Sequence, residues 1–152
     1  MTFLLDVNVL IALIDPAHVH HDIANRWFQK EGRSDWATCP FTQNGVLRVV
    51  GNPRYGNHPG SPAFVAGVLT RLVALDGHSF WPDDISLLDP DLVDGSRLLN
   101  AAHLTDTYLL ALARSKAGRL ATLDRRLAAS AVHGGEAALR LIEIQAGTCS
   151  SR

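Results

Sequence analysis

The sequence of 152 residues has little cysteine and no long hydrophobic run. Cys39 and Cys149 are too few for a disulfide framework and lack metal-ligand spacing, so we expect two free thiols in a reducing compartment. No apolar segment approaches the roughly 18 residues that a membrane-spanning helix needs. The first five residues contain no basic segment of a secretion signal. These absences predict a soluble, cytoplasmic protein.

The sequence also lacks an excess of charge of either sign, with 14 basic and 15 acidic residues and a net charge of −1. This balance excludes a polybasic arm, but it leaves room for a local basic rim. Only Lys30 and Lys116 are lysines, and the other bases are arginines, whose planar donor fork suits phosphate groups. Neither a phosphate-cradling GxxxxGK segment nor a GxSxG nucleophile elbow is present.

Strand and helix patterns alternate along the chain and predict an α/β protein with a mostly parallel sheet flanked by helices. Short apolar runs predict strands at residues 3–5, 36–39, 78–81, 119–123 and 139–144. Helical spacing predicts helices at 9–14, 20–30, 41–50, 62–75, 104–117 and 125–131, with a long loop at 51–62. The apolar faces place Trp27, Phe28 and Phe64 in the core. We expect a single domain over residues 1–146 and a frayed tail at 147–152.

Three aspartates stand where a parallel sheet usually binds its ligands, beyond the carboxyl ends of the strands. Asp6 follows the first strand, Asp124 follows the fourth, and Asp106 opens a strong helix. Asp106 and Asp124 would also suit helix first turns, whereas Asp6 is costly to bury without a partner. If the three converge, their like charges need a cation. Carboxylate oxygens suit Mg²⁺ or Mn²⁺ better than zinc, and such an ion activates water and neutralises phosphate charge.

Four ordered segments resemble PIN-domain proteins, and most closely the VapC-type toxin ribonucleases of bacterial VapBC toxin–antitoxin pairs. They are DVNVLIAL (6–13), TCPFTQNG (38–45), LTDTYLLALA (104–113) and LATLD (120–124), with support from NPRY (52–55) and FWPDD (80–84). The resemblance implies a five-stranded parallel α/β sandwich and Mg²⁺- or Mn²⁺-dependent endonucleolytic cleavage of RNA. Asp6, Asp106 and Asp124 match the acidic metal positions of the family. It further implies a homodimer that is inhibited by a cognate antitoxin.

One position departs from the family pattern, because Gln43 stands where the family commonly has glutamate. A glutamine can position water or accept a weak bond, but it cannot act as a base. With Asp6, Asp106 and Asp124 ionised, the site would carry a charge of −3, whereas a glutamate at position 43 would make it −4. The lower negative charge weakens metal binding and disfavours a second metal. Asp83 or Asp84, which follow a predicted strand, offer a replacement carboxylate as a hypothesis.

Contacts with RNA are predicted in the long loop and beyond the fourth strand. Tyr55 is a candidate for stacking on RNA bases, a contact that tolerates many sequences. The candidates for a basic rim are Arg48, Arg54, Arg97, Arg125 and Arg126. Arg125 and Arg126 are favoured among them because they adjoin Asp124.

Two other functions remain open from the sequence. In a phosphatase of the haloacid-dehalogenase type, Asp6 would form an aspartyl-phosphate, but the helper acid would fall on Asn8 and no catalytic lysine stands in context. Alternatively, Gln43 in place of an acid would suit a catalytically weakened module that binds RNA or a protein.

Overall fold

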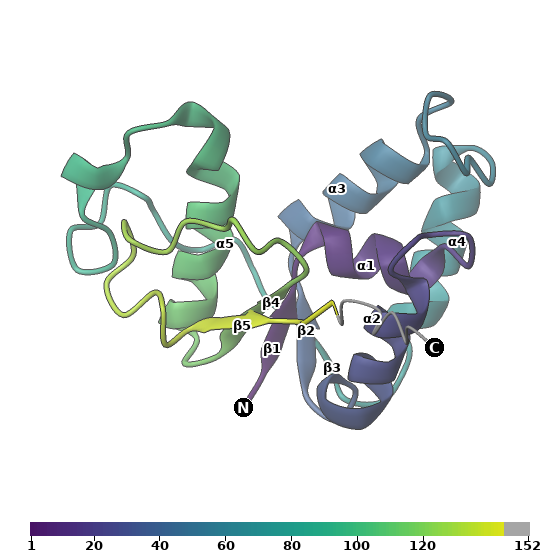
Figure 1. Cartoon of the computed structure of the whole chain (residues 1–152), viewed down its shortest axis with the longest axis horizontal. Coiled ribbons are helices and arrows are strands. Elements are labelled where there is room, and N and C mark those ends of the chain that lie inside the picture. The colour runs from purple at the N-terminus through teal and green to yellow at the C-terminus, as the bar shows by residue number, and fades with distance from the viewer. Residues whose placement is uncertain (145–152) are drawn as a thin grey trace, which may run out of the picture.

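The computed structural model describes residues 1–144 and contains one five-stranded parallel sheet with helices on both faces (Figure 1). The strand order is β3-β2-β1-β4-β5, and every neighbouring pair is parallel. This arrangement confirms the predicted fold class. The strands are β1 (Phe3–Leu5), β2 (Trp36–Thr38), β3 (His78–Phe80), β4 (Arg119–Thr122) and β5 (Leu139–Leu141).

The helices divide between the two faces of the sheet, since α1 to α4 cover one face and α5 covers the other (Figure 1). Successive side chains of β1 point to opposite faces of the sheet. Phe3 and Leu5 therefore pack in the core beneath α1 to α4, and Leu4 packs in the core beneath α5. Within residues 1–144 no helix is long and apolar enough to cross a membrane. The bounds are α1 (Val7–Ile14), α2 (His21–Trp27), α3 (Pro40–Val50), α4 (Pro62–Val73) and α5 (Leu104–Ser115). Shorter helical turns are η1 (Phe28–Gly32), η2 (Gly95–Arg97) and η3 (Ala101–His103).

The predicted helix at 125–131 does not form, and that prediction was wrong. The Asp124 carboxylate accepts a hydrogen bond from the Arg126 backbone N–H at 2.9 Å, which bends the chain into a turn after β4. A few residues later Val132 pairs with Val93 in an isolated antiparallel bridge. The apolar residues between these points, including Leu127, are buried without helical periodicity.

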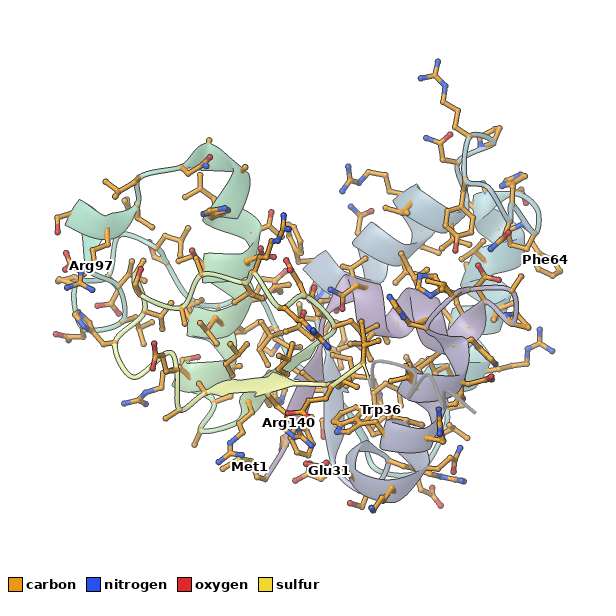
Figure 2. The ribbon with its side chains drawn as sticks, viewed as in Figure 1. Met1, Glu31, Trp36, Phe64, Arg97 and Arg140 are labelled. Carbon is orange, nitrogen blue, oxygen red and sulfur yellow. The ribbon has the colours of Figure 1, made fainter. Side chains whose placement is uncertain are left out.

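Two of the three aromatic residues expected in the core are there. Trp27 and Phe28 are buried, but Phe64 is 52% exposed and lies on the outer side of α4 (Figure 2). The face of α4 that enters the core is marked instead by Val65 and Leu69, which are one helical turn apart. Phe64 lies on the adjacent side of the helix, and the spacing of apolar residues in the sequence did not distinguish that side from the buried one.

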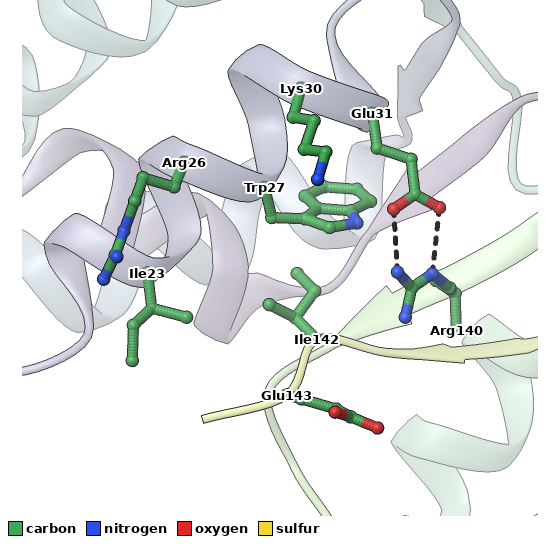
Figure 3. A pocket seen from close by; sticks show the side chains of 8 residues that line it. All are labelled: Ile23, Arg26, Trp27, Lys30, Glu31, Arg140, Ile142 and Glu143. Atoms are coloured by element: carbon green, nitrogen blue, oxygen red, sulfur yellow. Dashed lines mark hydrogen bonds and ion pairs between the residues drawn. The ribbon is translucent and has the colours of Figure 1, made fainter. Parts of the chain in front are cut away.

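The outer strand β5 is held to the α2–η1 segment by a paired ion bridge (Figure 3). The Arg140 guanidinium donates to both Glu31 carboxylate oxygens, at 3.0 and 2.7 Å. A hollow of about 550 Å³ lies beside this pair, and Trp27 and Ile142 are among its lining residues. The frayed tail predicted at 147–152 lies outside the described residues.

Candidate active site

Asp6 is the first residue after β1 and caps the N-terminus of α1. Its carboxylate accepts hydrogen bonds from the Val7 backbone N–H at 2.7 Å and from the Thr122 hydroxyl at 2.8 Å. The residue is only 6% exposed. Burial, followed by the negative charges of Asp106 and Asp124, raises the pKa of Asp6 from 3.8 to about 6, although the two hydrogen bonds act in the opposite direction. The site therefore holds a carboxylate that lacks a compensating positive charge.

Asn8 and Thr122 hold this carboxylate in place, and neither was predicted from the sequence as a residue of the nuclease site. The Asn8 amide nitrogen lies 3.4 Å from Asp6 Oδ2 and 3.1 Å from Thr122 Oγ1, and donates toward both oxygens. The Asn8 carbonyl oxygen accepts from the Leu123 backbone N–H at 3.1 Å, which ties the start of α1 to the end of β4. The available signal was spacing, since each residue stands two positions from an aspartate, in Asp6-Val7-Asn8 and Thr122-Leu123-Asp124.

Asp106 and Asp124 lie near Asp6, since the negative charges of both act on its carboxylate. Asp106 lies in the first turn of α5, and its pKa is raised mainly by burial and then by the negative charge of Asp124. Asp124 follows β4, and its backbone N–H donates to Thr122 Oγ1 at 3.1 Å. The three aspartates predicted from the sequence are thus close enough to repel one another. Within residues 1–144, however, no three acidic, histidine or cysteine side chains stand close enough to form a ready-made metal cluster.

A hollow of about 310 Å³ opens beside these carboxylates, and Asp6 and Asp106 both line it. Helix α3 contributes Phe41, Gly45 and Arg48 to its wall. Close packing explains the glycine at position 45, because a Cβ atom there would come within 2.8 Å of the Val7 side chain. Arg48 thus places a cationic side chain at the hollow, although the sequence favoured the arginines beside Asp124.

Gln43 lies on α3, but its amide is engaged with the end of the sheet. Its amide nitrogen donates to Thr38 Oγ1 at 2.9 Å, and Thr38 is fully buried at the end of β2. Gln43 is not among the residues that line the hollow of Asp6. Its predicted part in the chemistry, to position water or support the metal ligands, therefore stays a prediction.

The hypothesis that Asp83 or Asp84 replaces the missing acid stays a prediction, although both carboxylates have other partners. Asp83 Oδ2 accepts from the Phe41 backbone N–H at 3.1 Å, so this carboxylate binds the N-terminal turn of α3. Asp84 forms an ion pair with Lys116 at 2.8 Å.

The predicted RNA contacts are scattered over the surface. Tyr55 is half-buried and its hydroxyl donates to the buried Asp15 carboxylate at 2.5 Å, so the residue anchors the loop after α3. The Arg125 guanidinium donates to the Ile144 carbonyl oxygen at 2.7 Å. Arg54 and Arg126 are exposed. Arg97 pairs with Asp94 at 3.4 Å at the outer end of the α5 side (Figure 2). RNA binding by these residues stays a prediction.

The comparisons with known proteins agree with this fold. The family model of the PIN domain matches residues 3–132, so the chain belongs to the PIN-domain family. Ribonuclease VapC44 and ribonuclease VapC39 of Mycobacterium tuberculosis are each 44% identical over 134 residues, which cover 88% of this chain and 94% and 96% of theirs. Ribonuclease VapC29 of the same organism is 41% identical over 139 residues, or 91% of this chain and 96% of that protein.

A solved structure with the same fold is that of VapC20 of Mycobacterium tuberculosis, described as a toxin that cleaves the sarcin-ricin loop. It superposes with a TM-score of 0.61 over 86% of this chain and 96% of that one, at 12% sequence identity. At this identity the likeness shows the fold alone. It is consistent with the five-stranded parallel sheet predicted from the sequence.

Proposed function

We propose that this protein is a VapC-type toxin, a metal-dependent endoribonuclease of a type II toxin–antitoxin pair. The observation that carries the proposal is the convergence of Asp6, Asp106 and Asp124 at one edge of the sheet, where burial and mutual repulsion raise the pKa of the first two. Relatives named ribonuclease VapC, at 41–44% identity over nearly the whole chain, support the same activity.

The donor set suits Mg²⁺ or Mn²⁺. Hard carboxylate oxygens without cysteine or histidine are the ligands that these ions prefer. Asp6, Asp106 and Asp124 would hold the ion. When bound, the ion would activate water and neutralise the charge that develops on the phosphodiester.

The side chains of the protein provide orientation and charge around that position. The Thr122 hydroxyl and the Asn8 amide hold the Asp6 carboxylate in one orientation, with hydrogen bonds that also favour its ionised form. Arg48 lines the hollow from α3, where its guanidinium would attract a phosphate of RNA. Gln43 is neutral, so it would orient water without accepting a proton.

Gln43→Glu is expected to raise the affinity for Mn²⁺ by about three- to tenfold, because a fourth carboxylate adds negative charge near the ion. Isothermal titration calorimetry on the full chain measures this change. Gln29→Glu, on the exposed surface of η1, is the matched control for net charge. Equal affinities in the two variants would show that residue 43 does not face the metal position.

The proposed partners follow from the family. RNA is the substrate, with Arg54, Tyr55, Arg125 and Arg126 as its candidate contacts. A cognate antitoxin protein would inhibit the enzyme, and the functional form would be a homodimer in the cytoplasm. Sedimentation of the purified chain, alone and with the product of a neighbouring small gene, tests both assemblies.

The experiment that tests the activity is incubation of the purified protein with mixed RNAs in the presence of Mg²⁺, Mn²⁺ or EDTA. We expect fragments with discrete ends in the presence of either metal and none in EDTA. One alternative has a specific observation in its favour: Gln43 and the open arrangement of the acids suit a module that only binds RNA or a protein. Binding that persists in EDTA, with no fragments under any condition, would support the module.

The phosphatase hypothesis finds no support in the site. Asn8 offers an amide where that chemistry needs an acid, and its nitrogen donates toward Asp6 and Thr122. Lys116, one of the two lysines of the sequence, pairs with Asp84 at the end of α5. Covalent phosphate on Asp6 after incubation with a phosphodonor would be needed to revive it.

A further inference from the structure

A buried threonine connects Gln43 to a histidine on the outer strand of the sheet. Thr38 Oγ1 lies 2.9 Å from the Gln43 amide nitrogen and 2.8 Å from His78 Nε2. Thr38 ends β2 and is fully buried, while His78 begins β3. The His78 ring packs edge-on against Trp36, with ring centres 4.7 Å apart. The imidazole is therefore held in place on one side by an indole and at Nε2 by a hydroxyl.

The chemistry of the hydroxyl group sets the direction of both bonds. A threonine hydroxyl has one proton to donate, and an amide nitrogen can only donate. The Thr38 hydroxyl accepts from the Gln43 nitrogen, and among residues 1–144 the other group in hydrogen-bond reach of this hydroxyl is His78 Nε2, so the Thr38 proton is directed to Nε2. Nε2 must then be the unprotonated nitrogen of a neutral ring whose proton sits on Nδ1. Burial lowers the pKa of His78, which favours this neutral ring.

We propose that His78 is a positioning residue that fixes the direction of the Gln43 amide through Thr38. As long as Nε2 accepts a proton from Thr38, the amide nitrogen of Gln43 is held against Thr38 and its oxygen is left as the free end. Helix α3, which carries Gln43, also forms one wall of the hollow beside Asp6. The inference rests on the proposed nuclease function, in which that oxygen would orient water near the metal.

The reverse arrangement is the alternative that the relay excludes. If Nε2 carried the proton, it would donate to Thr38 Oγ1, and the Thr38 proton would find an acceptor only after the Gln43 amide turned its oxygen toward it. The amide would then be turned over, with its NH₂ group as the free end. An NH₂ group repels a cation and cannot accept from water. The histidine tautomer and the amide direction are thus locked to each other.

Nitrogen-15 NMR of the full chain tests the lock without any cleavage assay. We expect His78 in the unaltered protein to show Nδ1–H and an unprotonated Nε2, with His78→Phe used to assign its signals. In Gln43→Glu the new carboxylate only accepts, so Thr38 must donate to it and His78 must switch to Nε2–H. Thr38→Val removes the relay at nearly constant volume, and in the double variant Thr38→Val with Gln43→Glu the switch should not occur.

The NMR results distinguish coupling through Thr38 from its alternatives. A proton on Nε2 in the unaltered protein, or an unchanged tautomer in Gln43→Glu, would overturn the lock. A tautomer switch that persists in the Thr38→Val background would also overturn it, because the coupling would then be direct electrostatics.

Cleavage kinetics test the positioning role. His78→Phe is expected to lower kcat about three- to tenfold with KM unchanged, since about one oriented hydrogen bond is lost. His78→Gln offers a carbonyl acceptor near the position of Nε2 and should restore most of the rate. An equal loss in both variants would overturn the positioning role. A confirmed tautomer switch in a protein that cleaves no RNA would overturn the proposed function and leave the lock standing.

Discussion

Asp6→Asn is expected to lower the rate of RNA cleavage by roughly 10³-fold or more and to abolish toxicity on expression. Asp6 is the most buried of the three acids, and hydrogen bonds from Val7, Asn8 and Thr122 hold its carboxylate in one orientation. Asparagine keeps the shape of the side chain but removes the charge that would bind the ion. The measurement is single-turnover cleavage in Mg²⁺ or Mn²⁺, together with growth after induction.

Asp22→Asn is the matched control, because Asp22 is an exposed aspartate in the first turn of α2. It changes the net charge by the same amount and should leave both cleavage and toxicity unchanged. Circular dichroism of each variant checks that it is folded. Full toxicity of Asp6→Asn in cells that accumulate the folded variant would contradict the assignment of Asp6 to the metal site.

The sheet and the three acids could be predicted because short-range patterns define both. Apolar runs as short as Phe3-Leu4-Leu5 are readable as strands when helical segments separate them, and the connection rules then give a parallel sheet. The carboxyl ends of parallel strands share one edge, so Asp6 and Asp124 were expected on that edge, and the pairing of β1 with β4 makes them neighbours. The net charge of −1 hid this concentration of acid, because exposed arginines such as Arg54 and Arg97 offset it elsewhere on the surface.

The parts that were missed depend on contacts between residues far apart in the sequence. Asn8 and Thr122 are 114 positions apart, and only the pairing of β1 with β4 brings them together. Residues 125–131 suit a helix by their spacing. Their conformation is set instead by the turn at Asp124 and by the bridge between Val132 and Val93. Asp83 looked like a free acid at a strand end, whereas the start of α3 supplies its partner.

The buried charge of Asp6 should also make the stability of the metal-free protein depend on pH. Its pKa in the folded protein is about 6, against an ordinary value of 3.8, so the folded state holds the proton more tightly than the unfolded chain does. The contribution of Asp6 to the free energy of unfolding is therefore fully present below about pH 3.8 and is lost as the pH rises through 6. The loss corresponds to about 3 kcal/mol, as each pKa step of one is worth about 1.4 kcal/mol.

Asp6→Asn removes this dependence, because an amide stays neutral at every pH. We expect the variant to exceed the unaltered protein in free energy of unfolding by about 2 kcal/mol at pH 8 in EDTA, and to match it near pH 4. Urea unfolding at a series of pH values measures the difference. The gain would fall short of the full penalty because asparagine accepts fewer of the hydrogen bonds from Val7 and Thr122.

Added Mn²⁺ should reverse the order of the two proteins at pH 8. An ion that binds only the folded state stabilises it in proportion to the logarithm of its concentration, and it offsets the repulsion that Asp6 feels from Asp106 and Asp124. The unaltered protein should thus gain stability with Mn²⁺ while Asp6→Asn does not. A variant that is less stable than the unaltered protein at pH 8 in EDTA would mean that Asp6 serves the fold rather than a metal. In that case, loss of cleavage in Asp6→Asn would reflect a weakened fold and would not show that Asp6 takes part in catalysis.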